Sequence, residues 1–240
     1  MNASSDIDAR AFHSFEREAW NRASEVYQRY FSELTAQTIE PLLDSVAVSP
    51  APKFLDIASG PGHLAAAAER RGWSPVAIDF SESMVALGRS LHPGVDFRVG
   101  DAEALSFAEA EFDCAAMSFG ILHLAQPEAA VREAFRVLRK GGCFSFTTWA
   151  RREEARGFHV VLYALEQFGD PKVTIPAGPP FFRFSDGDEC RRVLELAGFS
   201  NVTEWKPQFR YPQHGPIRRC LYDIASRFGV ADGLYYLCSG

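Results

Sequence analysis

Short apolar runs that each end near a carboxylate recur along the first 150 residues of the chain. The first run covers residues 53–57 and contains Asp56, and Gly60 and Gly62 follow it directly. Apolar side chains at successive positions are typical of a strand that is buried on both faces. Two glycines after such a strand allow a tight turn that lies against a bound molecule. The pattern therefore predicts a strand, a ligand-binding loop and a helix over residues 64–71.

The same alternation of apolar runs and helical segments continues to about residue 150. Further strands are expected over residues 75–79, 95–99, 112–119 and 143–149. The helix before the last of these strands is expected over residues 127–140, with Gly141 as its stop. Five strand–helix units in succession require a parallel sheet with helices on both faces. The predicted fold class is α/β, a doubly wound, Rossmann-like sheet of seven mostly parallel strands.

The segments outside these units are expected to cover the sheet. Apolar and aromatic residues at helical spacing predict an N-terminal helix that ends near Phe31 and acts as a lid. Residues 170–183 are rich in proline and phenylalanine and predict a cap over the substrate. The last two strands are expected within residues 202–211 and 233–238, with a helix through Ile217 between them. The expected parts are a helical lid at 1–48, a cofactor-binding Rossmann-like core at 49–150, a substrate cap at 151–184 and the C-terminal part of the core sheet at 185–240.

Three carboxylates lie at the ends of neighbouring predicted strands. Asp56 belongs to the first strand, Asp79 ends the second, and Asp101 follows the third. The carboxyl ends of parallel strands converge on one crevice, so these side chains are expected to meet there. Asp79 can accept hydrogen bonds from the hydroxyls of a ribose, and Asp101 from the amino group of adenine. Each carboxylate alone is more often a solvated turn residue, but the series indicates a nucleoside ligand.

The residues around the glycine turn decide between two ligands of this kind. The pattern Gly60-x-Gly62-x-x-Ala65 fits the loose dinucleotide fingerprint, which would indicate NAD and an oxidoreductase. Asp56 favours another ligand, because a carboxylate here repels a pyrophosphate and attracts an ammonium group. S-adenosyl-L-methionine (SAM) carries an ammonium and a sulfonium and no phosphate. The sequence therefore predicts SAM as the cofactor.

Composition and charge narrow the class of partner. The chain has 240 residues, 47% of them apolar, so one large domain with attached caps can bury a full core. The net charge of −6 offers no general attraction to nucleic acid or to an anionic membrane, and a small-molecule acceptor is expected instead. Five widely spaced cysteines, no secretory segment and no apolar run of bilayer length predict a cytoplasmic protein without a membrane span. A homodimer is compatible with this composition.

The segments, in this order and spacing, resemble class I SAM-dependent methyltransferases, and within them the ubiquinone/menaquinone-biosynthesis-like (type 11) small-molecule group. The matching motifs are residues 55–62, 78–84, 100–105, 118–123 and 136–142. The family's usual first glycine is Ala58 here, and the stretch beyond Tyr211 is shorter than in similar proteins, which leaves the completeness of the last strand open. The expected cofactor contacts are Tyr27, Asp56, Ala58, Ser59, Gly60, Gly62, Asp79, Phe80, Met84, Asp101, Ala102, Glu103 and Ser118.

The resemblance implies methyl transfer by in-line displacement at the sulfonium methyl, which requires a nucleophile held close and aligned. The acceptor is expected to be a small, largely apolar or aromatic molecule, and its expected contacts are Trp20, Trp149, Phe181 and Phe182.

His123, just past the fourth strand, is the candidate catalytic residue, either as a general base or as a residue that only shapes the pocket. The second role is favoured, because methyl transfer from a sulfonium does not demand a base and no carboxylate partner of His123 is evident in the sequence. A SAM-binding protein without methyl transfer is the main alternative function, ahead of an NAD-dependent oxidoreductase.

Overall fold

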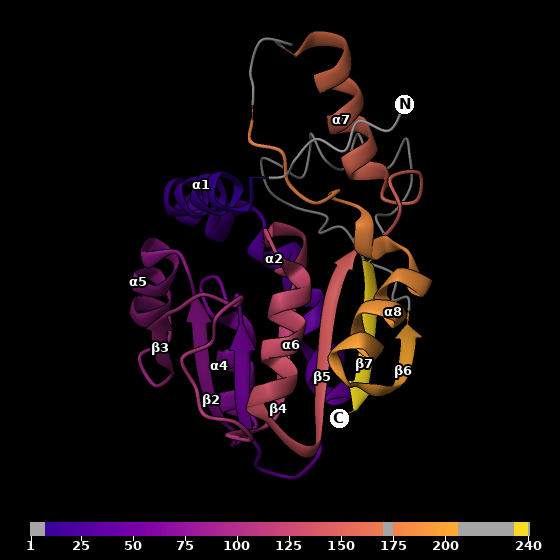
Figure 1. Ribbon diagram of the computed structural model, residues 1–240. Helices are drawn as coiled ribbons and strands as arrows, with labels where there is room; N and C mark the ends of the chain where they lie inside the picture. Colours follow the sequence, from indigo (N-terminus) through magenta and orange to yellow (C-terminus); the bar gives the residue numbers. More distant parts are fainter. Residues whose placement is uncertain (1–7, 170–174, 206–232, 240) are drawn as a thin grey trace.

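A computed structural model of the protein describes residues 8–169, 175–205 and 233–239 (Figure 1). Its strands are β1 (Lys53–Ile57), β2 (Ser74–Asp79), β3 (Asp96–Val99), β4 (Phe112–Ser118), β5 (Leu138–Trp149), β6 (Ser200–Trp205) and β7 (Gly233–Ser239). They form one sheet in the order β3-β2-β1-β4-β5-β7-β6. Strands β1 to β5 pair in parallel, whereas β7 pairs antiparallel with β5 and with β6. The five parallel strands confirm the predicted α/β, Rossmann-like fold.

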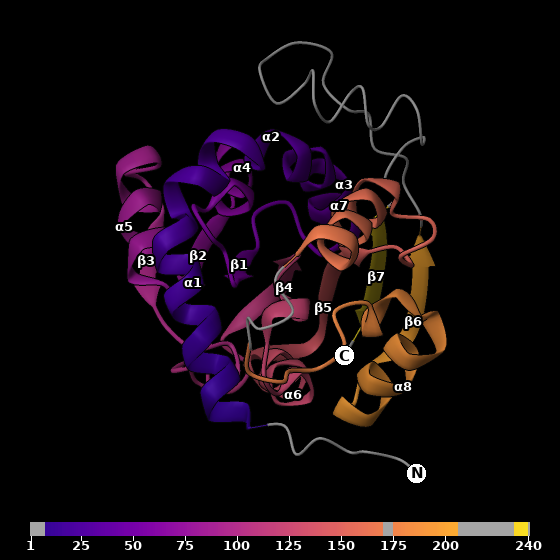
Figure 2. The same ribbon diagram turned by 90° about the horizontal axis from the view of Figure 1, so that it is seen from above.

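Helices cover both faces of the sheet and its carboxyl end. Those of the described residues are α1 (Ala9–Tyr30), α2 (Ser32–Thr35), α3 (Ile39–Ser45), α4 (His63–Arg70), α5 (Glu82–Leu91), α6 (Pro127–Val137), α7 (Arg156–Phe168) and α8 (Gly187–Ala197), with 3-10 turns η1 (Ala36–Thr38), η2 (Ile121–His123) and η3 (Arg183–Ser185). Figure 2 shows α6 and α8 on one side of the sheet and α3 and α4 on the other. Helix α1 lies across the carboxyl ends of the strands, above them in Figure 1.

The side chains of the central strands alternate between two layers of core, as burial on both faces requires. Leu55 and Ile57 of β1 pack in the layer that contains side chains of α6 and α8. Phe54 packs in the layer that contains side chains of α3 and α4. All three side chains are fully buried. The first apolar run is therefore the doubly buried strand that its pattern predicts.

The boundary between α6 and β5 differs from the prediction. The helix was expected to continue to the next glycine, but α6 ends at Val137 and β5 begins at the following residue. Leu138 pairs with Phe112 of β4, and the Arg139 guanidinium lies 2.6 Å from the carboxylate of Asp113. Pairing along β4 thus replaces the expected last turn of the helix.

Polar contacts hold α1 against the carboxyl end of the sheet. Asn21 Oδ1 accepts hydrogen bonds from Ser81 Oγ at 2.7 Å and from the Ser83 N–H at 3.2 Å, at the start of α5. Gln28 Oε1 lies 2.7 Å from His63 Nε2, at the start of α4. Helix α1 therefore closes over the loops that follow β1 and β2.

Several predictions concern segments that the structure describes only in part. Strand β6 matches the beginning of the strand expected within residues 202–211, and β7 matches the last expected strand. The helix expected through Ile217 and residues 170–174 of the expected cap lie outside the described residues. In the part of the chain that is described, none of the helices has the length and apolar character needed to cross a bilayer.

Candidate active site

A cavity of about 380 Å³ lies between α1 and the carboxyl ends of the central strands. This volume is in the range of small-molecule sites. Most of the predicted site residues line the cavity together: Trp20, Tyr27, Ala58, Ser59, Gly60, Asp79, Phe80, Met84, Asp101, Ala102, Ser118, His123, Trp149 and Phe181. The strand ends and the N-terminal helix therefore converge on one site, as the strand-end pattern predicts.

The loop after β1 contains two glycines whose missing side chains matter in different places, one at the cavity and one at the core. Ala58, Gly60 and Gly62 all have positive φ angles, of 52°, 53° and 77°. A Cβ added at Gly60 would meet nothing within 4 Å, whereas a Cβ added at Gly62 would lie 2.2 Å from Phe97 Cζ. Gly60 therefore keeps space at the cavity, and Gly62 keeps space for the core. An alanine in this region costs roughly 1–2 kcal/mol, which explains why a glycine is usual at the position of Ala58.

Two buried carboxylates lie beneath this loop. Asp79 accepts hydrogen bonds from the N–H groups of Gly60 and Ser81, both at 2.8 Å. Asp56 Oδ2 accepts one from the Ala65 N–H at 3.0 Å, while its Oδ1 is buried without a partner among the described residues. Burial raises the pKa of Asp79 to about 6 and the pKa of Asp56 to about 8, against the opposing effect of these N–H donors. A positive group bound beside them would offset the cost of burying their charge.

The wall of the cavity carries acidic side chains without basic partners of the lysine or arginine type. Among the described residues that line it are Asp79 and Asp101, and none is Lys or Arg. Asp101 Oδ2 lies 3.1 Å from His13 Nε2 of α1. A pyrophosphate has no counter-charge in such a wall, whereas a cationic ligand has two. The residues therefore favour SAM over NAD.

His123 on η2 is held by a carboxylate of α1. Its Nδ1 lies 2.9 Å from Glu16 Oε2, which also accepts a hydrogen bond from Trp20 Nε1 at 3.2 Å. The Trp20 and Phe181 rings meet the imidazole edge-on, at 4.8 and 6.3 Å between ring centroids. His123 therefore has a carboxylate partner that was not evident in the sequence, because the packing of α1 on η2 supplies it from a distant part of the chain.

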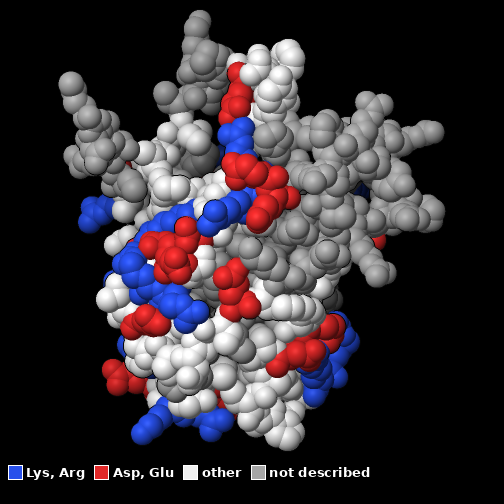
Figure 3. All heavy atoms as spheres, turned by 90° about the vertical axis from the view of Figure 1, so that its right-hand side faces the viewer, with Lys and Arg blue, Asp and Glu red and all other residues white. Residues whose placement is uncertain are grey.

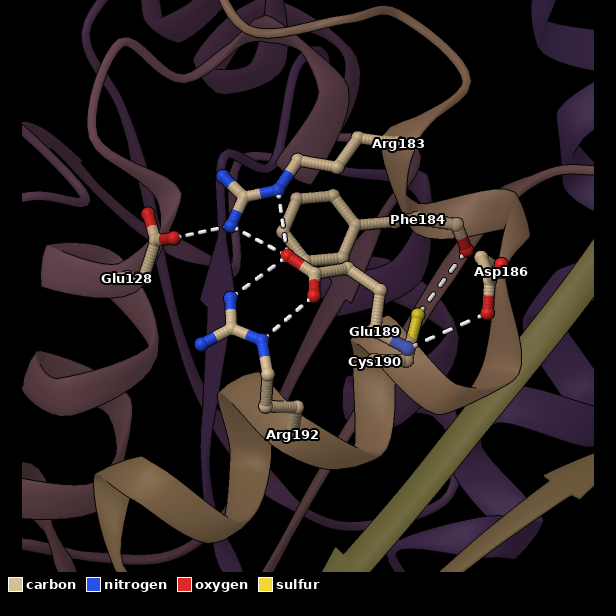
Figure 4. A network of polar contacts seen from close by, with 7 residues as sticks. All are labelled: Glu128, Arg183, Phe184, Asp186, Glu189, Cys190 and Arg192. Atoms are coloured by element: carbon tan, nitrogen blue, oxygen red, sulfur yellow. Dashed lines mark hydrogen bonds and ion pairs between the residues drawn. The ribbon is translucent and has the colours of Figure 1, made fainter.

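The chain segment that carries Phe181 is tied to the core by ion pairs. Arg183 donates hydrogen bonds to Glu128 of α6 and to Glu189 of α8, and Arg192 donates to the same Glu189 (Figure 4). These pairs link α6, α8 and η3 just after Phe181 in the chain. The network therefore fixes one end of the segment that places this ring at the cavity.

Comparison with known proteins points to the same segments of the chain. Residues 55–146 match a family model described as a methyltransferase domain. Over 101 residues the chain is 38% identical to the demethylmenaquinone methyltransferase of Renibacterium salmoninarum. Over 107 residues it is 41% identical to the ubiquinone/menaquinone biosynthesis C-methyltransferase of Bradyrhizobium diazoefficiens. Residues 55–146 therefore form a SAM-dependent methyltransferase domain. The cofactor of such a domain is SAM.

The sequence similarity to these relatives covers less than half of the chain. It covers 42% of the chain and 43% of the Renibacterium protein, and 40% and 42% in the Bradyrhizobium comparison. The chain therefore spans less than half the length of these curated relatives. The fold likeness extends further: the structure of a SAM-dependent methyltransferase from Thermotoga maritima matches with a TM-score of 0.62 at 20% identity, covering 92% of this chain and 98% of that one.

Four of the predicted site residues lie outside the cavity wall. Asp56 is fully buried beneath the loop, on the side of α4, and Gly62 is the N-cap of α4. Glu103 Oε1 accepts a hydrogen bond from the Gln126 N–H at 2.9 Å, which turns it toward α6. Phe182 packs into the aromatic cluster beside the cavity. The cavity wall thus contains only part of the predicted set, and direct ligand contacts of these four stay predictions.

Sequence reasoning missed residues of the site outside the strand ends, above all Glu16, which contacts His123. The one signal for Glu16 is its spacing, because it lies four positions before Trp20 on α1 and so shares a helix face with a predicted substrate contact. His63, Phe31 and Phe119 line the cavity without having been assigned to it.

Asp56→Asn is expected to change how the stability of the protein without ligand depends on pH. The pKa of Asp56 in the folded chain is about 8, so the folded chain keeps this proton where the unfolded chain loses it. The free energy of unfolding is then greatest below the unfolded pKa of about 4 and falls as the pH rises toward 8. Asparagine still accepts from the Ala65 N–H and does not titrate.

The variant should therefore be more stable than the wild type at pH 8, by a few kcal/mol, and the difference should shrink toward about pH 5. Chemical denaturation of both proteins at the two pH values measures it. A stability difference that does not change with pH would contradict the burial of an ionisable Asp56.

Proposed function

We propose that the protein transfers the methyl group of SAM to a small, largely apolar or aromatic acceptor. The observation that carries this proposal is the composition of one cavity wall. It combines the carboxylates of Asp79 and Asp101 with the rings of Trp20, Trp149 and Phe181. The carboxylates suit the cationic, nucleoside-containing cofactor, and the rings suit an apolar acceptor beside it.

Bound SAM supplies an electrophilic methyl on a positive sulfur. The chain's own residues have to hold the acceptor in line with that methyl and to keep water away. Phe119 and Trp149 stack with ring centroids 4.3 Å apart and form an apolar wall. Trp20 and Phe181 come from α1 and from the segment before η3. A flat ring fits between such surfaces better than a polar chain does.

In this proposal α1 is a lid over the bound molecules. Four of its polar contacts each reach a different segment that borders the cavity. The contacts are His13–Asp101, Glu16–His123, Asn21–Ser81 and Gln28–His63. Because they join α1 to loops and helix starts rather than to the sheet, they can break together while the sheet stays intact. Phe181, within the predicted substrate cap of residues 151–184, lines the cavity from the segment before η3.

The distribution of charge supports a small-molecule acceptor. On the face shown in Figure 3, basic side chains stand beside acidic ones. Arg152 and Glu166 form one pair of opposite charge, 2.7 Å apart. Nucleic acid binding relies on basic side chains gathered on one face. The names of the relatives refer to demethylmenaquinone and to ubiquinone/menaquinone biosynthesis. A quinone-type aromatic ring is therefore the first class of acceptor to test.

Phe181→Ala is expected to weaken binding of the acceptor and to leave binding of SAM unchanged. Phe181 lines the cavity next to His123, so its loss removes apolar contact worth roughly 1–2 kcal/mol and raises the KM of the acceptor about 5- to 30-fold. Phe182→Ala is the matched control, because Phe182 packs beside the cavity without lining it. Phe182→Ala should lower the free energy of unfolding by more than it weakens acceptor binding. A comparable loss of SAM affinity in both variants would mean that this segment is part of the cofactor wall.

Methyl transfer from labelled SAM into an extract of small metabolites tests the proposal. Label in an extractable aromatic product, absent with heat-inactivated protein, is the expected result. Saturable SAM binding without any labelled product would instead favour a SAM-binding protein that catalyses no methyl transfer. Tight NAD binding with no SAM binding would favour the oxidoreductase.

A further inference from the structure

Glu16 is an enclosed carboxylate whose contacts all point toward the acceptor side of the cavity. Its side chain is 15% exposed, on the face of α1 that covers η2. Oε2 lies 2.9 Å from His123 Nδ1 and accepts a hydrogen bond from Trp20 Nε1. The Trp20 ring packs edge-on against the imidazole, with centroids 4.8 Å apart. Two contacts on one oxygen leave the carboxylate little freedom to turn.

This contact determines which nitrogen of His123 carries the proton. An ionised carboxylate only accepts hydrogen bonds, so a neutral imidazole beside it places its single proton on Nδ1. The lone pair then lies on Nε2. Among the residues that the structure describes, Nε2 has no hydrogen-bond partner, and His123 lines the cavity. The wall therefore presents a proton acceptor beside the aromatic rings.

We propose that Glu16 is a positioning residue that holds His123 in the Nδ1–H form, so that Nε2 accepts the proton of an acceptor hydroxyl during methyl transfer. This inference rests on the proposed function. The hydroxyl O–H bond breaks with its proton on Nε2, the oxygen forms a bond to the methyl carbon, and the carbon–sulfur bond breaks with its electron pair on sulfur. The products are the methyl ether, S-adenosylhomocysteine and an imidazolium that the Glu16 carboxylate stabilises.

We infer that the acceptor bears a hydroxyl because a hydroxyl, unlike a neutral amine, needs a base to become a good nucleophile. A phenol, with a pKa of about 10, is protonated near neutral pH and is a weak nucleophile until a base takes its proton. A neutral amine attacks with its own lone pair and loses its proton only afterwards. An enclosed histidine–carboxylate pair among aromatic rings thus fits an aromatic acceptor that bears a hydroxyl.

Other ionisable groups around the cavity share in any pH dependence. Asp79 lies near enough for a charged His123 to lower its pKa, while burial raises it. Asp101, Tyr27 and His63 also line the cavity, and Glu16 is the one that contacts the His123 ring. A test therefore has to measure the tautomer of His123 directly, in addition to the overall rate of methyl transfer.

The experiment compares wild type, Glu16→Gln, Glu16→Asp and, as the matched control on the same helix, Glu18→Gln. Glu18 is two-thirds exposed and pairs with Arg22 on the surface. Nitrogen-15 NMR of the histidine side chains reads the His123 tautomer in the protein without ligand. SAM affinity is measured by calorimetry. Single-turnover methyl transfer is measured over a range of pH with 2-naphthol and with 2-naphthylamine as probe acceptors.

The expected result is a protonated Nδ1 and an unprotonated Nε2 in wild type and in Glu18→Gln. This preference should be lost in Glu16→Gln and partly restored in Glu16→Asp. Turnover of 2-naphthol should fall at least about tenfold in Glu16→Gln, with SAM affinity unchanged and 2-naphthylamine less affected. A wild-type His123 that carries its proton on Nε2, or a Glu16→Gln variant with the wild-type tautomer, overturns the proposal. Equal 2-naphthol rates in wild type and Glu16→Gln overturn it as well.

The two proposals can fail separately. If wild type neither binds SAM nor transfers a methyl group, the proposed function fails, and the tautomer alone decides whether Glu16 positions His123.

Discussion

Asparagine in place of His123 is expected to slow methyl transfer to a hydroxyl-bearing acceptor about 10²- to 10⁴-fold. The substitution keeps a polar side chain at the wall but removes the ring nitrogen that can take up a proton. Because Glu16 contacts Nδ1, Nε2 is the atom that remains for the acceptor. Single-turnover rates at saturating SAM measure the effect.

His63→Asn is the matched control for this substitution. His63 also lines the cavity, but its Nε2 lies 2.7 Å from Gln28 Oε1 and its Nδ1 3.2 Å from His92 Nε2. Burial, with the nearby His92 and Arg70, lowers the pKa of His63 to about 4, so the ring stays neutral near pH 7. We expect its loss to change the rate less than about tenfold. If the two variants lose rate equally, His123 only shapes the pocket.

Gly62→Ala is expected to lower the free energy of unfolding by roughly 2–4 kcal/mol. Gly62 has φ 77°, and a methyl group there would lie 2.2 Å from the Cζ of Phe97. Phe97 is buried between α4, α5 and β2, so its ring has to shift within a packed layer. A thermal scan should show the midpoint falling by roughly 5–15 °C.

The Gly60→Ala variant separates an effect on cofactor binding from an effect on the stability of the fold. Gly60 has φ 53°, but its added methyl group meets no protein atom within 4 Å, and the residue lines the cavity. Only the backbone cost of roughly 1–2 kcal/mol should appear in stability, while SAM affinity should fall about tenfold or more as the methyl group enters ligand space. Should Gly60→Ala destabilise the protein as much as Gly62→Ala, the loop would serve the fold rather than a ligand.

The core of the fold could be predicted from the sequence because its signals are local. Phe54, Leu55 and Ile57 are apolar, and the structure buries them on both faces of a parallel sheet. The end of α6 could not be predicted in this way. Helix propensity extends past Val137, but the pairing of Leu138 with Phe112 extends the chain along β4, and that pairing depends on the tertiary structure.

The site was predictable where topology dictates it. Asp79 and Asp101 follow strand ends, and parallel strands bring their ends together. Asp56 lies within β1, so the alternation of side chains directs it to the face of α4, below the cavity. The contact between Glu16 and His123 joins segments that are distant in the sequence, and no local pattern could place α1 over η2.

Calorimetric titration of the protein with SAM, and separately with NAD, tests the central claim most directly. Wild type should bind SAM saturably at one site and bind NAD more weakly or not at all, because the wall holds Asp79 and Asp101. Asp79→Ala should weaken SAM binding by roughly 1–3 kcal/mol, as expected for lost hydrogen bonds to a charged acceptor. Absent SAM binding, tighter binding of NAD than of SAM, or equal SAM affinity in wild type and Asp79→Ala would contradict a SAM site at the carboxyl ends of β1, β2 and β4.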